Sequence, residues 1–201
     1  MTGVKESKSF CHGCGEHVDT YLVSRETGAG PSNSKQDKCC IFCGMPVVKL
    51  SSKKVIPVNN IIVADDSPMI REMLKDILTD ENLARNVTCC DHGADFLSTF
   101  TGMAMEGEPP ALAVLDLAMP VLNGVNAAIA MRAIEKPLGL LPAPILFFTS
   151  QKCDDSFKKV LSYCKPAQYI NKGVSSTPEL LASRVRNVII QLLMKSQTLD
   201  R

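Results

Sequence analysis

Residues 61–78 read I-I-V-A-D-D-S-P-M-I-R-E-M-L-K-D-I-L, an apolar run that ends in acid and continues into a helix-like pattern. The run over 61–65 predicts a buried strand. Ser67 is suited to cap the start of a helix, and Pro68 fits the first helical turn. Apolar residues then recur mostly three or four positions apart, which predicts a buried helix face made by Ile70, Leu74, Ile77 and Leu78.

The alternation of strand and helix continues along the rest of the chain. Further strands are expected at 86–90, 111–116, 145–149 and 168–170. Helices are expected around 96–100, over about 125–135 and 157–164, and from Pro178 onward with Thr177 as its cap. Such alternation implies right-handed crossovers. It therefore predicts an α/β fold, a doubly wound five-stranded parallel sheet covered on both faces.

Acidic, hydroxyl and amine side chains stand where the predicted strands end. Asp65 and Asp66 close the first strand, and Asp116 closes the third. Thr149 ends the fourth strand, and Lys172 follows the fifth. Because ligands of such sheets bind beyond the carboxyl ends of the strands, these five side chains are expected at one edge.

Carboxylates brought together repel each other unless a cation joins them. A small hard ion with oxygen ligands, above all Mg²⁺, suits a partly hydrated carboxylate site. A lysine and a threonine hydroxyl beside that ion can hold phosphoryl oxygens. One carboxylate could then act as the nucleophile toward a phosphoryl donor.

Four short motifs carry a resemblance to a known family. They are V-A-D-D-S at 63–67, D-L-A-M-P-V-L-N-G at 116–124, F-F-T-S at 147–150 and Y-I-N-K at 169–172. With these motifs in this order, the chain from about residue 61 to its C-terminus resembles the receiver domain of two-component response regulators. The resemblance implies a flavodoxin-like fold and a phosphorelay signalling protein rather than a conventional enzyme.

The resemblance also implies a role for each residue that matches a motif. Asp116 would accept a phosphoryl group from a phosphohistidine of a sensor histidine kinase or phosphotransfer protein. Asp66, Asp116 and the backbone carbonyl of Ala118 would bind Mg²⁺ directly. Asp65 would assist in binding the metal through water. The receiver would take part in its own phosphorylation and dephosphorylation.

Three further positions match the phosphoryl-binding and switching residues of the family. Thr149 and Lys172 would bind phosphoryl oxygens. The ring of Tyr169 would turn inward as Thr149 moves toward the phosphate, which would change binding to an unknown downstream partner. Two positions depart from the family: Gly173 stands where proline is usual, and Ser150 where a very small residue is usual.

Nine cysteines are present, and five of them fall within the first 43 residues. An odd count without an apparent secretory signal argues against a disulfide framework and favours a reducing, cytoplasmic location. Two C-x-x-C-G units predict a zinc ribbon whose Zn²⁺ ligands are Cys11, Cys14, Cys40 and Cys43. Cys39 remains open as a spare ligand, a reactive thiol or a small apolar residue.

Composition divides the chain into a zinc-ribbon-like module at 1–48, a linker at 49–58 and a receiver at 59–201. Through residue 58 there are eight Lys and Arg against five Asp and Glu, or +3; the remainder has fourteen against sixteen, or −2, which recovers the net +1. This balance argues against nucleic acid as a partner. No apolar run is long enough for a membrane span.

Two functions remain open from the sequence. The first is a phosphorelay response regulator that is switched by phosphorylation of Asp116. The second is an unphosphorylated adaptor that uses the zinc ribbon for contacts with protein or nucleic acid. A third, a phosphatase or phosphotransferase built on related chemistry, would need an extra acid or base near Asp116, and none is evident. The sequence leaves undetermined the cognate kinase, the output partner, the oligomeric state and the lifetime of the phosphate.

Overall fold

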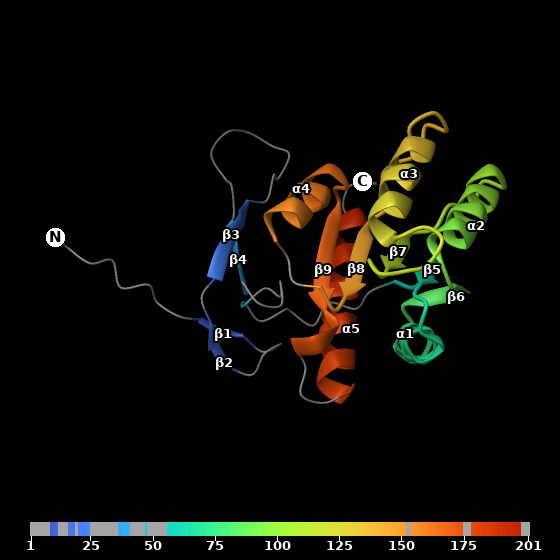
Figure 1. Cartoon of the computed structure of the whole chain (residues 1–201). Coiled ribbons are helices and arrows are strands. Elements are labelled where there is room, and N and C mark those ends of the chain that lie inside the picture. The colour runs from blue at the N-terminus through green and yellow to red at the C-terminus, as the bar shows by residue number, and fades with distance from the viewer. Residues whose placement is uncertain are drawn as a thin grey trace.

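The computed structural model describes residues 9–11, 16–18, 20–24, 36–40, 47, 56–151, 154–174 and 178–197. A parallel five-stranded sheet forms the centre of the larger part of the chain (Figure 1). Its strands, in spatial order, are β6 (Ala84–Cys90), β5 (Val58–Ala64), β7 (Leu112–Leu115), β8 (Ile145–Thr149) and β9 (Ala167–Asn171). The prediction of a five-stranded parallel α/β fold is confirmed.

Helices connect the strands and cover both faces of the sheet. They are α1 (Pro68–Asp80), α2 (Gly93–Met105), α3 (Gly124–Glu135), α4 (Asp155–Tyr163) and α5 (Pro178–Gln197), with a short 3₁₀ turn η1 (Lys172–Val174) after β9. The strand order reverses at β5, because the chain first adds β6 on one side and then β7 on the other. In an open α/β sheet this reversal opens a crevice beyond the carboxyl ends of the strands, here β5 and β7.

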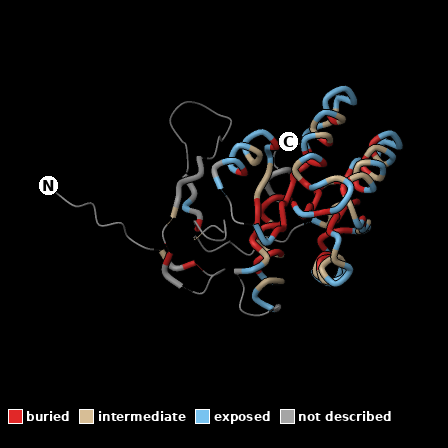
Figure 2. The backbone as a smooth tube through the Cα atoms, in the orientation of Figure 1, coloured by how far each residue is buried: buried red, intermediate tan, exposed pale blue. Residues whose placement is uncertain are grey.

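Alternate side chains of the strands enter two separate hydrophobic clusters. Ile61 and Val63 of β5 belong to a cluster that contains residues of α1 and α5. Ile62 and Ala64 belong to a second cluster that contains residues of α2, α3 and α4. Both faces of the sheet are therefore buried, as the red central strands in Figure 2 show, and this explains why β5 has an almost continuous apolar sequence.

Two strands extend by two or more residues further toward their amino ends than the sequence pattern predicts. β5 begins at Val58 rather than at 61, and β6 begins at Ala84 rather than at 86. Asn60 interrupts the apolar pattern of β5, but it is buried because its Nδ2 donates to the Glu108 carbonyl and its Oδ1 accepts from Asn86. Polar residues in a strand that are paired with each other lower the apolar signal without breaking the strand.

The start of α1 differs in one detail from the expected cap. Ser67 occupies the N-cap position and Pro68 begins the helix, but the Ser67 side chain makes no capping hydrogen bond. Instead the backbone N–H of Ser67 donates to Oδ1 of Asp65 at 3.1 Å. The turn between β5 and α1 is thus held by an acid of the sheet edge.

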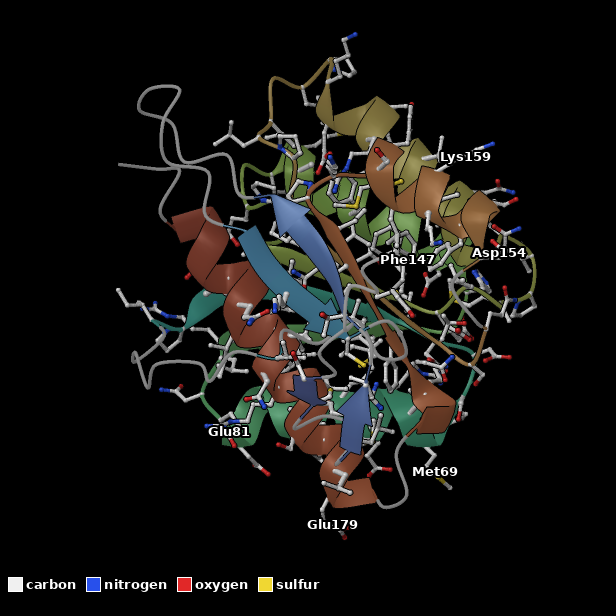
Figure 3. The ribbon with its side chains drawn as sticks, turned by 90° about the vertical axis from the view of Figure 1, so that its left-hand side faces the viewer. Met69, Glu81, Phe147, Asp154, Lys159 and Glu179 are labelled. Atoms are coloured by element: carbon white, nitrogen blue, oxygen red, sulfur yellow. The ribbon has the colours of Figure 1, made fainter. Side chains whose placement is uncertain are left out.

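The N-terminal part contains two short antiparallel pairs. β1 (Ser9–Cys11) pairs with β2 (Glu16–Val18), and β3 (Thr20–Ser24) pairs with β4 (Gln36–Cys40). Both pairs lie on the side of the receiver where β9 and α5 are found (Figures 1 and 3). Cys14 and Cys43 lie outside the described residues. The zinc ribbon and the bounds 1–48, 49–58 and 59–201 therefore stay predictions.

Helix α4 covers part of the sheet with one side and faces solvent with the other. Phe147 lies beneath α4, whereas Asp154 at the start of that helix and Lys159 on its outer side point away from the sheet (Figure 3). Among the helices in the described part of the chain, none has the length and apolar character that crossing a membrane requires.

A buried ion pair joins the end of α3 to two other segments. Arg132 contacts Oε2 of Glu135 at 2.6 Å and donates to the backbone carbonyls of Ala143 and Cys164. Glu135 in turn accepts the backbone N–H of Ala143 through Oε1 at 2.8 Å. The pair therefore ties α3 to the segment that leads into β8 and to the end of α4.

Replacing Glu135 with alanine is expected to lower the free energy of unfolding by about 3–5 kcal/mol, because Arg132 would stay buried without its counter-charge. Urea denaturation followed by circular dichroism measures the loss. The control is Glu81→Ala, which breaks the half-exposed pair with Arg186 and should cost at most about 1 kcal/mol. Equal losses in the two variants would contradict a stabilising role of the buried pair.

Candidate functional site

The sheet delivers the predicted site residues to one edge. Asp65 directly follows β5 and Asp116 directly follows β7, and these strands pair so that Ala64 lies opposite Leu115. The backbone N–H of Asp116 donates to the Ala64 carbonyl at 2.8 Å, which extends the pairing to the strand ends. The register alone therefore sets the two aspartates side by side.

Three carboxylates gather at this edge. Asp65, Asp66 and Asp116 each offer an oxygen, and these oxygens all lie within 4.8 Å of one another. Asp65 is 1% exposed and Asp116 is 5% exposed, whereas Asp66 is exposed to solvent. A cluster of oxygen donors with one open side matches the ligand preference of a hard divalent cation that keeps some of its water.

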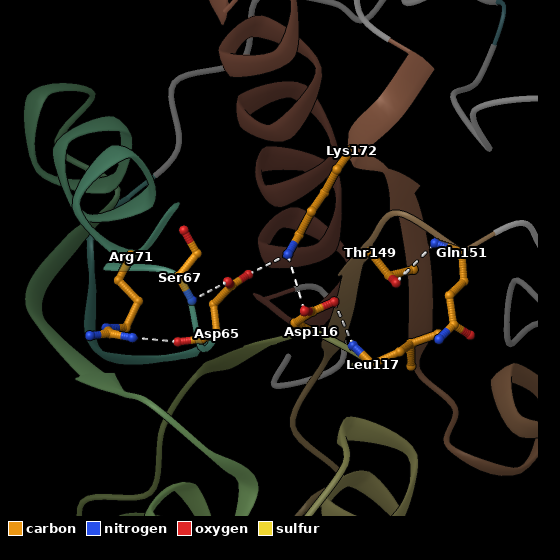
Figure 4. A network of polar contacts seen from close by, with 8 residues as sticks. All are labelled: Asp65, Ser67, Arg71, Asp116, Leu117, Thr149, Gln151 and Lys172. Atoms are coloured by element: carbon orange, nitrogen blue, oxygen red, sulfur yellow. Dashed lines mark hydrogen bonds and ion pairs between the residues drawn. The ribbon is translucent and has the colours of Figure 1, made fainter. Parts of the chain in front are cut away.

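Lys172 follows the edge strand β9 and contacts two of these acids. Its Nζ lies 2.6 Å from Oδ2 of Asp65 and 3.2 Å from Oδ2 of Asp116 (Figure 4). The same Nζ lies 5.3 Å from the centroid of the Phe148 ring, so the ammonium group is held over an aromatic face. Lys172 thus places one positive charge among the negative charges of the edge.

Burial raises the pKa of Asp65 above its ordinary value, and desolvation is the largest cause. The hydrogen bond and the positive charge of Lys172 act in the opposite direction, and the negative charge of Asp116 raises the pKa further. Lys172 therefore compensates the burial of Asp65 only in part. A divalent cation would supply the missing positive charge.

The two carboxylate oxygens of Asp116 have different surroundings. Oδ1 accepts the backbone N–H of Leu117 at 2.7 Å, while Oδ2 faces Lys172. The backbone of Asp116 is also packed closely, since a Cβ added at Gly124 would lie 1.9 Å from the Asp116 carbonyl oxygen. Glycine at 124 is therefore required for the start of α3 to approach the loop that carries Asp116.

Thr149 and Tyr169 lie on the next two strands. Thr149 is buried, and its Oγ1 accepts the backbone N–H of Gln151 at 3.2 Å. The Tyr169 ring is also buried and meets Phe157 edge to face, with centroids 5.9 Å apart. Ala118 is exposed in the loop after Asp116, and the part of its backbone carbonyl in metal binding stays a prediction.

Comparisons with known proteins show which family the chain belongs to. Residues 61–186 match the family described as the response regulator receiver domain. The chain belongs to this family. The match covers the five strands of the parallel sheet from within β5 onward, and it ends within α5.

Two curated proteins resemble the receiver in sequence. One is the peroxide stress-activated histidine kinase mak3 of Schizosaccharomyces pombe, 32% identical over 95 residues, which is 46% of this chain and 4% of mak3. The other is the transcriptional regulatory protein AruR of Pseudomonas aeruginosa, 26% identical over 133 residues, which is 66% of this chain and 50% of AruR. The chain thus spans half or less of the length of these relatives.

Solved structures share the fold of the receiver. The receiver domain of the histidine kinase CKI1 from Arabidopsis thaliana, complexed with Mg²⁺ and BeF₃⁻, aligns with TM-score 0.53 and 20% identity over 64% of this chain and 88% of that one. The response regulator domain of Thermotoga maritima CheB aligns with TM-score 0.52 and 24% identity over 68% and 96%. These likenesses support the flavodoxin-like fold.

Two residues contact the receiver's acidic edge or its loops without having been predicted from the sequence. Arg71 of α1 donates to the backbone carbonyl of Asp65 at 2.6 Å and so holds the turn after β5. Asn171, the last residue of β9, bonds to the loop after β8. A polar residue in an otherwise apolar strand end was the signal for Asn171, whereas nothing in the pattern of α1 distinguishes Arg71 from a solvated arginine.

Mg²⁺ is expected to raise the melting temperature of the receiver, and more so at neutral than at mildly acidic pH. The pKa of Asp65 is higher in the folded than in the unfolded protein. The contribution of Asp65 to the free energy of unfolding without metal is therefore fully present at a pH below the unfolded-state pKa. It is lost as the pH rises through the folded-state pKa. Mg²⁺ needs the ionised carboxylate, so its stabilising effect grows over the same range.

Thermal denaturation with and without Mg²⁺, at several pH values, measures this effect. Asp65→Asn should reduce the Mg²⁺-dependent shift, and Asp76→Asn, which alters an exposed acid of α1, should leave it unchanged. A shift of the same size at every pH and in both variants would show that the metal binds elsewhere.

Proposed function

We propose that this receiver accepts a phosphoryl group on Asp116 and so acts as a phosphorelay response regulator. Mg²⁺ would be bound by Asp66, Asp116 and the backbone carbonyl of Ala118, with Asp65 assisting through water. The observation that supports this function best is the convergence of three carboxylates and Lys172 at the end of β5 and β7. The proposed donor is a phosphohistidine on a sensor histidine kinase or a phosphotransfer protein.

In the proposed reaction a carboxylate oxygen of Asp116 attacks the phosphorus atom. The bond between phosphorus and the donor's nitrogen breaks, its electron pair stays with the leaving imidazole, and an acyl phosphate forms on the aspartate. Mg²⁺ would offset the negative charge of the transferring group. The protein's contribution is chiefly to hold Asp116 in place, which the Leu117 N–H on Oδ1 supports.

The residues around Asp116 would then adjust to the new charge. Lys172 would move from Oδ2 of Asp116 to a phosphoryl oxygen, and the Thr149 hydroxyl would donate to another. Tyr169 packs against Phe157 of α4, so a shift at Thr149 would be transmitted to that helix. The surface near α4 and β9 would then exist in two states with different affinities for a downstream protein.

Incubation with a small phosphodonor such as acetyl phosphate is expected to label the protein only when Mg²⁺ is present. Asp116→Asn should abolish the label, because the amide is a poor nucleophile and cannot form the acyl phosphate. The matched control is Asp91→Asn, which changes an exposed acid after β6 at the same edge of the sheet. Phos-tag electrophoresis measures the labelled fraction, and undiminished labelling of Asp116→Asn would refute the assignment.

The rival function is an adaptor that is never phosphorylated. It differs from the phosphorelay proposal in one measurable respect, the dependence of partner binding on the phosphodonor. A downstream protein that binds equally well with and without acetyl phosphate, and equally well to Asp116→Asn, would favour the adaptor. Binding that rises only in the labelled wild-type protein favours the response regulator.

For the N-terminal module we propose a Zn²⁺ site made by Cys11, Cys14, Cys40 and Cys43. The paired C-x-x-C-G spacing supports it. So does the position of Cys11 and Cys40, which are both buried at the last residue of a short strand. A module this small has little apolar core, so bound metal would supply much of its folding free energy.

The purified chain is expected to contain about one zinc ion, the number a four-thiolate site holds. Atomic emission spectroscopy measures the content. Cys40→Ser should lower it and unfold the N-terminal module, whereas Cys89→Ser, which alters an exposed cysteine of β6, should not. Full zinc occupancy in Cys40→Ser would contradict the ligand set.

A further inference from the structure

The side chain of Asn171 bridges the loops that follow β8 and β9. Its Nδ2 donates to the backbone carbonyl of Gln151 at 2.9 Å and, over a longer 3.4 Å, to that of Ser150. Its Oδ1 accepts the backbone N–H of Gly173 at 2.8 Å. Asn171 is buried, and both ends of its amide are used.

Glycine at 173 makes one end of this bridge available. Proline, the residue usual at this position in the family, has no backbone N–H to donate to Oδ1 of Asn171. The Gly173 N–H fixes which end of the amide carries the oxygen, and so it turns Nδ2 toward the loop after β8. Gly173 and Asn171 therefore form one hydrogen-bonded unit.

The unit reaches both groups that are proposed to bind the phosphoryl oxygens. Lys172 lies between Asn171 and Gly173 in the chain, and Gln151 donates its backbone N–H to Oγ1 of Thr149. Figure 4 shows Lys172 and Thr149 on two sides of Asp116, with Gln151 beside Thr149. A continuous set of hydrogen bonds thus runs from Gly173 through Asn171 and Gln151 to Thr149.

We propose that Asn171 is a positioning residue for phosphoryl transfer, which ties the loop that holds the Thr149 hydroxyl to the backbone beside Lys172 and so keeps Thr149 in place. The proposal rests on the phosphoacceptor function given above. Groups that are already in place lower the barrier because no ordering of loops is needed during the reaction. A hydroxyl that accepts the Gln151 N–H still has its own proton to donate to a phosphoryl oxygen.

The simpler reading is that Asn171 only satisfies buried polar groups at a strand end. The two readings differ in what a substitution changes. A purely structural residue affects stability and leaves the chemistry of the folded fraction intact. A positioning residue slows the labelling of folded protein and does so through Thr149, while the carboxylates that bind Mg²⁺ are unaffected.

The test is the rate of labelling of the full chain by acetyl phosphate with saturating Mg²⁺. Asn171→Ala is expected to slow labelling about tenfold, which corresponds to about 1.4 kcal/mol of barrier height. Its affinity for Mg²⁺, measured by calorimetry, should stay within about twofold of wild type. In a Thr149→Ala background the same substitution should have little further effect, because residues that act as a unit are non-additive.

Asn60→Ala is the matched control for loss of a buried asparagine. Asn60 also donates to a backbone carbonyl, that of Glu108, but near the opposite end of the sheet. It should lower the melting temperature without slowing the labelling of folded protein.

The outcomes separate this proposal from the function on which it rests. Wild-type protein that labels normally, with Asn171→Ala no slower than Asn60→Ala, overturns the positioning role alone. The role is also overturned if Asn171→Ala slows labelling by the same factor in the Thr149→Ala background as in the wild-type protein. If the wild-type chain is not labelled at all, the phosphoacceptor function fails and the proposal fails with it.

Discussion

The contact between Lys172 and the carboxylates of Asp65 and Asp116 is the interaction on which the site depends. Two nearly buried acids and a third exposed one meet at a single edge, and the fold removes most of the water that would otherwise screen them. Burial raises the pKa of Asp65, and the hydrogen bond and charge of Lys172 oppose this rise only in part. The edge is consequently suited to attract a divalent cation and, after it, an anionic phosphoryl group.

The apolar core of the parallel sheet supplies the stability that keeps these charged residues together. Three of the five strands, β5, β6 and β7, end at residues that belong to one hydrophobic cluster, namely Ala64, Cys90 and Leu115, so the backbone that carries Asp65 and Asp116 is anchored in the core. Backbone groups complete the arrangement: the Ser67 and Leu117 N–H groups donate to Asp65 and Asp116. Stability therefore resides in the apolar faces, and the edge is left with unbalanced charge.

Much of this could be predicted from the sequence because strand ends and acids coincide. The apolar runs before Asp65 and Asp116 are buried on both faces, and their short length and β-branched or aliphatic residues are typical of buried strands. The signal failed where polar residues satisfy each other inside the fold, as Asn60 and Asn86 do near the amino end of the sheet. The bonds of Asn171, like those of Arg132, join segments far apart in the chain. No periodicity of a single element reports such contacts.

The most direct test of the central claim is to locate the phosphoryl group chemically. After reaction with acetyl phosphate and Mg²⁺, borohydride reduction converts an acyl phosphate of aspartate to homoserine, which peptide mass spectrometry identifies by position. The account predicts this mark at residue 116, dependent on Mg²⁺ and missing from unreacted protein. A mark at Asp65 or Asp66, or none in protein that binds Mg²⁺, would contradict it.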